Sequence, residues 1–232
     1  MRNTSKRWLD VHTELLAAFG PQHWWPGETS FEVMVGAVLT QNTAWGNVER
    51  AIANLKTADA LSGHAILDLV PDALAAHLRP AGYFNVKARR LRNLCAFLRD
   101  QDVLDDPLRL AATAPPAELR RRLLAVNGVG EETADSILLY ALGLPVFVVD
   151  AYTRRIFSRL GMVQGDESYA AIQSAFEHAL PRDPTLFNEY HALIVRLGKD
   201  LCRPRPRCGE CPLRRACRTA TIAPPTREEA SP

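Results

Sequence analysis

The chain lacks the features of a membrane protein or a secreted protein. None of its 232 residues falls in an uninterrupted apolar run of about eighteen, which a membrane-spanning helix would need. The N-terminal segment contains Asp10, His12 and Glu14, which a signal peptide would not carry. The net charge is only +2, too small for a protein that coats nucleic acid over its whole surface. We therefore expect a cytoplasmic protein, nucleoid-associated if it is bacterial, with no membrane partner.

Strand-like patterns are also missing. No segment keeps a period of two, whereas apolar residues recur at helical spacing through most of the chain. This predicts an all-α fold whose first helix covers 5–19, with Ser30 as the N-cap of the second. The expected later helices cover 31–40, 47–57, 64–78, 86–100, 107–113, 116–125, 131–142, 151–160, 167–180 and 185–201. The Pro-rich, charged end of the chain, 222–232, is expected to be disordered.

Cysteine is scarce, yet four of the five cysteines are crowded near the C-terminus in a C-x5-C-x2-C-x5-C pattern. They are Cys202, Cys208, Cys211 and Cys217. In a cytoplasmic chain this crowding favours a metal over disulfides. Zinc sites usually use two separated C-x2-C pairs and only one is present, so the pattern suits a cluster with one thiolate per iron, with zinc as the alternative. Cys95 lies on an apolar helical face and is expected in the core.

Two glycines separated by one residue lie between the helices expected over 116–125 and 131–142. The segment Val126-Asn127-Gly128-Val129-Gly130 predicts a tight hairpin, because a sharp turn with positive φ and a close backbone approach both favour glycine. The hairpin amides and the N-terminus of the following helix would then point outward, where they could bind a phosphate. An ordinary turn between two helices is the alternative.

Basic residues gather in three clusters. They are Lys87, Arg89, Arg90 and Arg92; Arg120, Arg121 and Arg122; and Arg196, Arg203, Arg205, Arg207, Arg214, Arg215 and Arg218. Such local patches suit contacts with DNA phosphates, and solvated helix faces are the alternative.

The hairpin and the downstream Pro145-Val146-Phe147-Val148-Val149-Asp150 resemble the helix-hairpin-helix and Gly/Pro-Asp signature of the endonuclease III superfamily of DNA glycosylases. Leu39-Thr40-Gln41-Asn42-Thr43, Gly82–Ala88 and the four-cysteine loop are also similar to segments of that superfamily, so the resemblance covers nearly the whole chain. It implies two helical lobes with the active site in the cleft between them. A six-helix barrel with the hairpin would span 25–140, and 1–24 with 141–221 would form a lobe carrying a [4Fe-4S] cluster on the four cysteines.

The resemblance implies damaged double-stranded DNA as the partner, bound by a monomer. Asp150 would be the catalytic carboxylate that stabilises positive charge on the sugar or activates water; a purely structural helix cap is the alternative. One of the two polar residues in the loop at 41–42 would fill the gap left by an extruded base, although a plain turn would use the same residue types. The expected DNA-binding residues are Gln41, Asn42, Asn127, Gly128, Val129, Gly130, Thr133 and Lys199.

Glu132 departs from the members of the superfamily that cleave the strand. Those members carry a lysine two residues after the second glycine of the hairpin, and its amine forms a Schiff base with the sugar. A carboxylate cannot do so, which predicts a monofunctional glycosylase with Glu132 at the active site. A second departure from the superfamily concerns the cysteine loop. Its first two cysteines are separated by five residues, where the superfamily usually has six.

The aromatic residues suggest the damaged base. Trp24, Trp25 and Trp45, together with Glu132, resemble the 3-methyladenine DNA glycosylase branch of the superfamily, and aromatic walls can hold a cationic alkylated purine. Core packing is the alternative for the adjacent tryptophans. Two other functions stay open. One is an endonuclease III-type glycosylase for oxidised pyrimidines with weak lyase activity, and the other is a non-catalytic helix-hairpin-helix DNA-binding protein.

Overall fold

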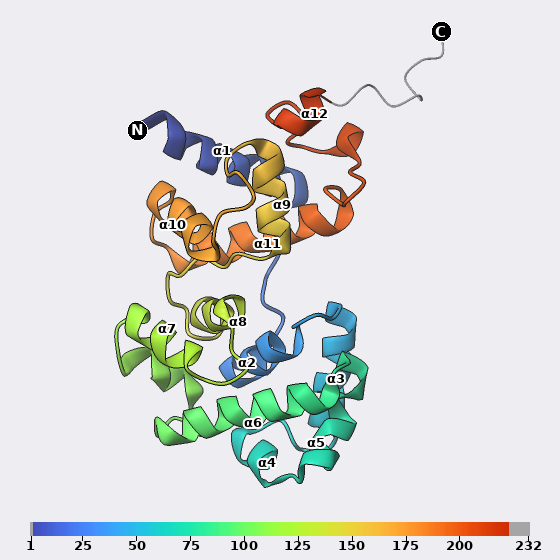
Figure 1. Ribbon diagram of the computed structural model, residues 1–232, viewed down its shortest axis with the longest axis vertical. Coiled ribbons are helices and arrows are strands. Elements are labelled where there is room, and N and C mark those ends of the chain that lie inside the picture. The colour runs from blue at the N-terminus through green and yellow to red at the C-terminus, as the bar shows by residue number, and fades with distance from the viewer. Residues whose placement is uncertain (1, 223–232) are drawn as a thin grey trace. The chain divides into compact units, whose positions relative to one another are not determined.

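The computed structural model describes residues 2–222, and within this range the chain consists of helices and loops without a strand (Figure 1). The all-α prediction is therefore confirmed. No helix in this range is long and apolar enough to cross a membrane. The disorder expected for 222–232 falls, apart from Ile222, outside the described residues.

The chain divides into two compact units. One, which we call the Asp150 unit, comprises Met1–Trp24, Val149–Arg182 and Leu186–Pro232, so far as these segments are described. The other, which we call the hairpin unit, comprises Trp25–Val148 and Asp183–Thr185. The chain passes between the units at Trp24–Trp25, at Val148–Val149 and on either side of Asp183–Thr185, and the two adjacent tryptophans belong to different units.

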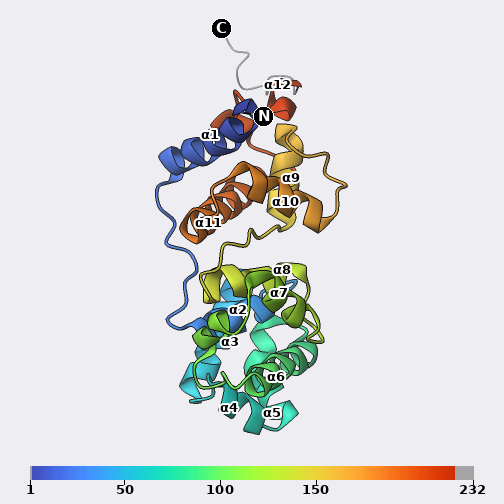
Figure 2. The same cartoon turned by 90° about the vertical axis from the view of Figure 1, so that its left-hand side faces the viewer.

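The hairpin unit is built around α2, which runs from Ser30 to Leu39 and is buried from Phe31 onward. Helices α3, α6 and α8 and the π-helical turn η3 pack around it, as Figures 1 and 2 show. An apolar helix without a polar face is stable only when other helices cover it on every side. The elements of this unit after α2 are α3 Trp45–Thr57, α4 Gly63–Asp68, α5 Pro71–Leu78, η1 Arg79–Ala81, α6 Phe84–Asp100, η2 Pro107–Ala112, α7 Pro116–Leu124, α8 Glu131–Ser136 and η3 Ile137–Ala141.

Four local predictions in this unit were wrong. Thr29, not Ser30, caps α2, because its hydroxyl accepts a hydrogen bond from the amide of Glu32 at 3.1 Å. The single helix expected over 64–78 is two helices, since Pro71 lacks an amide hydrogen and begins a new helix, α5. The helix expected over 131–142 is α-helical only to Ser136 and then widens into η3, while 107–113 forms the 3-10 helix η2.

The Asp150 unit contains α1 Arg2–Phe19, α9 Ala151–Leu160, α10 Tyr169–Ala179, α11 Pro184–Asp200, η4 Cys208–Glu210 and α12 Arg218–Ile222. Its core is aromatic: Trp8 stacks on Phe157 at 5.1 Å between ring centroids, and Phe176 meets both rings edge-on. The buried hydroxyl of Tyr190 donates a hydrogen bond to the carbonyl of Trp8 at 2.8 Å. These contacts hold α1, α9, α10 and α11 together.

Candidate active site and cysteine loop

Asp150 is the N-cap of α9, as its position after an apolar run predicted. Its Oδ1 atom accepts hydrogen bonds from the amide of Thr153 at 2.7 Å and from the hydroxyl of the same residue at 2.8 Å. The side chain of Asp150 keeps 11% of its surface exposed. The aspartate therefore satisfies the helix terminus with one oxygen while part of its side chain stays accessible.

The second oxygen of Asp150 faces a histidine from another helix. Oδ2 lies 3.7 Å from Nε2 of His191, which α11 carries and which is buried. Burial alone would raise the pKa of Asp150, but the charge of His191 and the hydrogen bonds from Thr153 outweigh it, and the pKa is lowered. The carboxyl is therefore ionised at neutral pH, as a group that stabilises positive charge must be. Sequence reasoning gives His191 no catalytic role, because a single histidine on a helix is more often structural.

The segment 126–130 is a tight hairpin in which the two glycines have different roles. Gly128 has φ of +97°, and a Cβ atom there would lie 2.2 Å from Cγ of Arg90, so only glycine fits. Gly130 has ordinary extended backbone as the N-cap of α8, and a Cβ atom added there would have no neighbouring atom within 4 Å. The positive φ expected of the turn is therefore found at Gly128 and not at Gly130. Open space above its backbone leaves room for another molecule.

Gln41 is bonded to this hairpin. Its Nε2 atom donates to the carbonyl of Gly128 at 3.1 Å and to the hydroxyl of Thr133 at 2.9 Å, and its Oε1 atom accepts from Arg90. Asn42, the next residue, is exposed and has φ of +54°. The loop after α2 therefore presents Asn42 outward and holds Gln41 against the hairpin.

The other residues expected to bind DNA differ in accessibility. Val129 and Thr133 are buried, so their side chains serve the fold of the hairpin. Asn127 and Lys199 are exposed, although the carbonyl of Asn127 accepts a hydrogen bond from Asn93 at 2.9 Å. The exposed residues and the backbone of the hairpin are thus the parts available to a partner.

Glu132 is exposed in the first turn of α8, beside Glu131. Acidic residues at this end of a helix are stabilised by the helix dipole. Glu131 also lies 3.5 Å from Arg120. The two carboxylates occupy the helix end where the sequence suggested a phosphate, so the helix N-terminus is already partly neutralised by the chain itself.

Three aromatic rings meet in the hairpin unit. Trp25 makes an edge-on contact with Trp45 at 5.1 Å and a tilted contact with Tyr140 at 5.1 Å. Gly36 on α2 makes room for this arrangement, because a Cβ atom there would come within 3.1 Å of the Trp25 indole. All three rings are partly exposed at the edge of the core. Trp24, the third tryptophan of the expected base pocket, is assigned to the Asp150 unit, and sequence reasoning did not include Tyr140.

The four clustered cysteines line one cavity, with about 320 Å³ of atom-free space including open solvent. None of them forms a disulfide. Burial raises the pKa of the Cys211 thiol to about 11, and the three neighbouring cysteines raise it further, against a backbone hydrogen bond at Leu213. Among the described residues, no group of three or more His, Cys, Asp or Glu side chains is arranged to hold a single metal ion. Four thiols around one shared space fit a group larger than a single ion.

Helix α9 connects the cysteine loop with the aspartate. Arg159 donates to Sγ of Cys202 at 3.3 Å and to the carbonyl of Arg203 at 2.6 Å. Arg155 donates to the carbonyls of Cys202 at 2.8 Å and of Gly198 at 3.0 Å. The helix that Asp150 caps is therefore attached to the loop by two arginines one turn apart.

Comparison with known proteins identifies the family. Residues 35–182 match the HhH-GPD superfamily base excision DNA repair proteins. This chain belongs to that superfamily. A protein of Methanocaldococcus jannaschii, named provisionally as a DNA repair glycosylase, is 49% identical over 208 residues, which is 89% of this chain and 94% of that protein. The chain is thus a base excision repair DNA glycosylase of the endonuclease III superfamily.

Two solved structures have the same fold. An endonuclease III–DNA complex superimposes with a TM-score of 0.80 at 23% identity, covering 94% of this chain and 96% of that one. A 3-methyladenine DNA glycosylase of H. pylori, bound to 1,N6-ethenoadenine, superimposes with a TM-score of 0.71 at 29% identity, covering 84% of this chain and 97% of that one.

Two residues of the first basic cluster of the glycosylase serve the fold. Lys87 is buried, and its ammonium group donates to the carbonyls of Leu39 at 2.9 Å and of Ala81 at 2.7 Å. Arg92 donates to two carbonyls, those of Ile66 at 2.9 Å and Leu69 at 2.7 Å. The expected phosphate contact from these side chains is wrong, because a folded helix end needs their donors.

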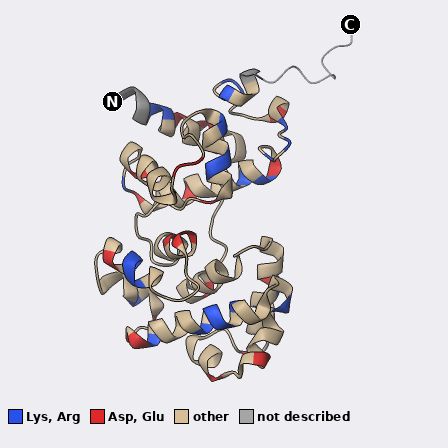
Figure 3. Ribbon diagram, viewed as in Figure 1, with Lys and Arg blue, Asp and Glu red and all other residues tan. Residues whose placement is uncertain are grey.

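The other basic residues are spread over several elements. Figure 3 shows Lys and Arg segments on α6, α7 and α9 and along the cysteine loop. On α7, Arg120 forms a bidentate pair with the buried Asp135, and Arg121 pairs with Glu118. The cysteine loop keeps its arginines exposed, namely Arg203, Arg205, Arg207, Arg214, Arg215 and Arg218.

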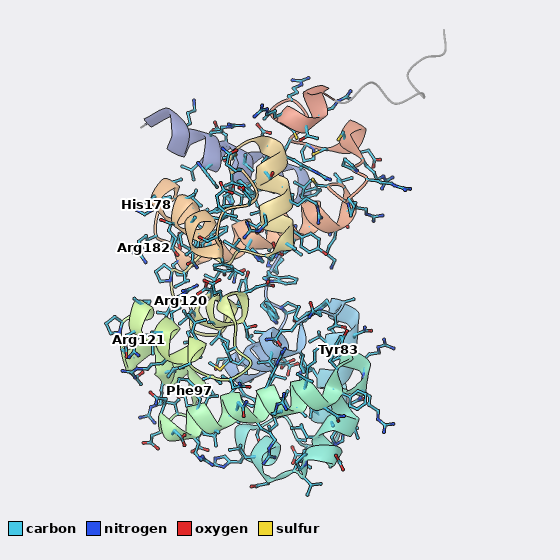
Figure 4. All side chains as sticks on the ribbon, viewed as in Figure 1. Tyr83, Phe97, Arg120, Arg121, His178 and Arg182 are labelled. Atoms are coloured by element: carbon cyan, nitrogen blue, oxygen red, sulfur yellow. The ribbon has the colours of Figure 1, made fainter. Side chains whose placement is uncertain are left out.

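Tyr83 is a candidate that sequence reasoning passed over. Its side chain is labelled in Figure 4, and the residue is 73% exposed. Its φ is +46°, directly after Gly82 with φ of +67°. A bulky residue at positive φ carries backbone strain, which persists where the surroundings enforce it and often marks a functional position. The adjacent Gly-aromatic pair was the only sequence signal for it.

Proposed function

We propose that this glycosylase is monofunctional and that it removes alkylated purines, such as 3-methyladenine, from double-stranded DNA. The observation that carries the proposal is an ionised Asp150 whose side chain keeps 11% of its surface exposed. A glutamate stands at position 132, where a strand-cleaving relative would need a lysine. The chain therefore has a carboxylate for hydrolysis and a side chain at 132 that cannot form an imine.

The proposed reaction is hydrolysis of the N-glycosidic bond. As the bond breaks, its electron pair leaves with the base, and positive charge develops on the sugar beside Asp150. Water adds to C1′ of the sugar, and its proton passes to the carboxylate and then to solvent. A purine with a methyl group on N3 carries a positive charge, so it departs as a neutral base and needs no separate general acid.

The aromatic group of Trp25, Trp45 and Tyr140 supports a cationic substrate. The faces of aromatic rings attract cations, with about 0.5–2 kcal/mol for each favourable contact. Stacking can also return roughly 1–3 kcal/mol of the cost of extruding a base from the duplex. The 29% identical glycosylase of H. pylori, which was solved with a modified adenine, supports the same substrate class.

We propose that exposed residues of the chain contact the DNA. The exposed Asn42 is a better candidate for filling the gap in the duplex than Gln41, which is bonded to the hairpin. Tyr83 offers an aromatic face to the bases, and Lys199 and the exposed arginines of the cysteine loop offer charge to the backbone.

We propose a [4Fe-4S] cluster as the resident cofactor, held by Cys202, Cys208, Cys211 and Cys217. The shared cavity and the four free thiols fit such a group. A cluster here would close a loop that has only Leu213 buried among residues 202–218 and so cannot form a core of its own. When bound, it supplies a rigid, covalently held centre for the loop.

Asp150→Asn tests the catalytic role. We expect base release from methylated duplex DNA to be lost while the Kd for the duplex stays within about twofold, because the amide keeps a hydrogen-bond acceptor for Thr153 but has no charge. A parallel loss of release, binding and folding would instead assign Asp150 a structural role. Chromatography of the bases released from methylated and from oxidised DNA tests the substrate, and release of oxidised pyrimidines alone would favour the endonuclease III-type activity.

Metal analysis of the purified protein tests the cofactor. We expect iron and acid-labile sulfide in equal amounts with broad visible absorption, and Cys211→Ala should lose both. Cys95→Ala is the matched control, since Cys95 is fully buried in the hairpin unit and should leave the iron content unchanged. A colourless protein that contains one zinc ion would contradict the proposal.

A further inference from the structure

The two oxygens of Asp150 have different surroundings. Oδ1 accepts two hydrogen bonds from Thr153, one from its amide and one from its hydroxyl. Oδ2 makes neither of these bonds and has Nε2 of His191 at 3.7 Å. Since Oδ1 is occupied by the helix cap, Oδ2 is the oxygen that remains to face a sugar cation or a water molecule.

The position of His191 is determined by the core of the Asp150 unit. Its neighbour on α11, Tyr190, is fully buried, and the hydroxyl of Tyr190 donates to the carbonyl of Trp8. The Tyr190 ring also packs edge-on against Phe157, which belongs to α9. Helix α11 therefore cannot rotate without disrupting the core, and the imidazole of His191 is held next to the N-terminus of α9.

The charges around Asp150 come from few groups. His191 on α11 is the one titratable side chain that shifts the pKa of this carboxyl downward in the described residues, and Thr153 on α9 adds uncharged hydrogen bonds. Burial opposes both. A carboxylate at 3.7 Å from a protonated imidazole is stabilised in its ionised form, while a neutral imidazole can still present a polar nitrogen to Oδ2.

We propose that His191 is a positioning residue for base removal: it orients Oδ2 of Asp150 toward the reacting sugar and keeps that carboxyl ionised. The inference rests on the proposed role of Asp150 and adds a partner to it. His191 acts through Asp150 and does not itself touch the substrate. The 3.7 Å between Nε2 and Oδ2 is longer than a normal hydrogen bond, so the contact acts through charge and close packing.

Two substitutions separate orientation from charge. His191→Leu removes both, and we expect kcat for base release to fall by roughly tenfold or more at neutral pH with KM nearly unchanged. The acid limb of the kcat profile should move to higher pH, because His191 lowers the pKa of Asp150 and its removal should raise that pKa. His191→Gln keeps a polar group, so kcat at neutral pH should recover most of the loss while the acid limb stays displaced.

His12→Gln is the matched control. His12 is another partly buried histidine of the same unit and lies on α1. The centroid of its ring is 5.1 Å from that of Tyr190. The His12→Gln substitution should change neither kcat nor the acid limb of the kcat profile. Thermal unfolding of all three variants shows whether a loss of activity follows a loss of folded protein.

Carbon-13 NMR of the Asp150 carboxyl, assigned with Asp150→Asn, gives a result that does not depend on turnover. We expect its pKa to lie below the ordinary value of about 3.9 and to rise in His191→Leu. An unchanged Asp150 pKa in a folded His191→Leu protein, or unchanged kcat in both His191 variants, would overturn the role of His191. If Asp150→Asn itself remains active, the proposed function fails instead, and the two failures are thereby distinguished.

Discussion

The amide nitrogen of the Gln41 side chain donates to the carbonyl of Gly128, 3.1 Å away, and so connects the loop after α2 with the turn of the hairpin. The same nitrogen also reaches Thr133 at the start of α8, and Arg90 on α6 donates to the oxygen of this side chain. One glutamine therefore joins three segments that are far apart in the sequence. Its side chain cannot enter a duplex while it makes these bonds.

Gln41→Ala is expected to destabilise the hairpin unit. Loss of a hydrogen bond typically costs about 1 kcal/mol, and three groups lose their partner here, so we expect about 1–3 kcal/mol in urea unfolding. Asn42→Ala is the control: the residue is exposed, and the change should cost less than about 1 kcal/mol in stability. In base release from damaged duplex DNA we expect the opposite order of the two variants. Relative to the stability that each variant loses, Asn42→Ala should reduce base release more than Gln41→Ala. Equal stability of the two variants would contradict the interpretation of Gln41.

The second prediction concerns the ion pair beneath the hairpin. Arg120 holds the fully buried Asp135 with two hydrogen bonds of 2.7 and 3.0 Å. Arg120→Ala would leave a buried carboxylate without its cation, which typically costs about 3–5 kcal/mol. Arg121→Ala is matched in chemistry, but Arg121 is exposed and its pair with Glu118 is expected to contribute little to stability. Chemical denaturation of both variants measures the difference, and similar losses would show that the Asp135 pair adds nothing.

The sequence predicts the helical architecture well because helices depend on local periodicity. Asp150 at the start of α9 and Cys95 in the core follow from spacing alone, and the structure confirms both. Long-range pairings do not leave such a signal. The approach of His191 to Asp150, the burial of Lys87 under two carbonyls and the contact of Tyr140 with Trp25 all depend on how distant helices pack. Lys87 shows that a charged residue is not always exposed, since a basic side chain can donate hydrogen bonds to carbonyls at helix ends.

The third prediction tests the aromatic group through the charge of the substrate. Tyr140→Leu removes a ring that lies 5.1 Å from Trp25. We expect kcat/KM to fall about tenfold for the cationic 3-methyladenine and less for the neutral 1,N6-ethenoadenine, because only the cation loses a cation–π contact. Tyr140→Phe keeps the ring and should behave like the native enzyme on both bases. Equal losses on the two substrates would assign Tyr140 to packing of the core.

The last prediction concerns Glu132 and the absence of strand cleavage. Sodium borohydride with an oligonucleotide that contains an abasic site should trap no covalent adduct with the native glycosylase, because the residue at 132 has no amine. Glu132→Lys supplies one: its nitrogen would attack C1′, water would leave, and the resulting imine would be reduced to a stable adduct. Glu131→Lys is the neighbouring control, since that side chain is directed to Arg120 at 3.5 Å. Trapping by Glu132→Lys alone would place residue 132 beside the sugar. A strong adduct with the native protein would show that another lysine, with Lys199 the first to test, performs the reaction that Glu132 was expected to exclude.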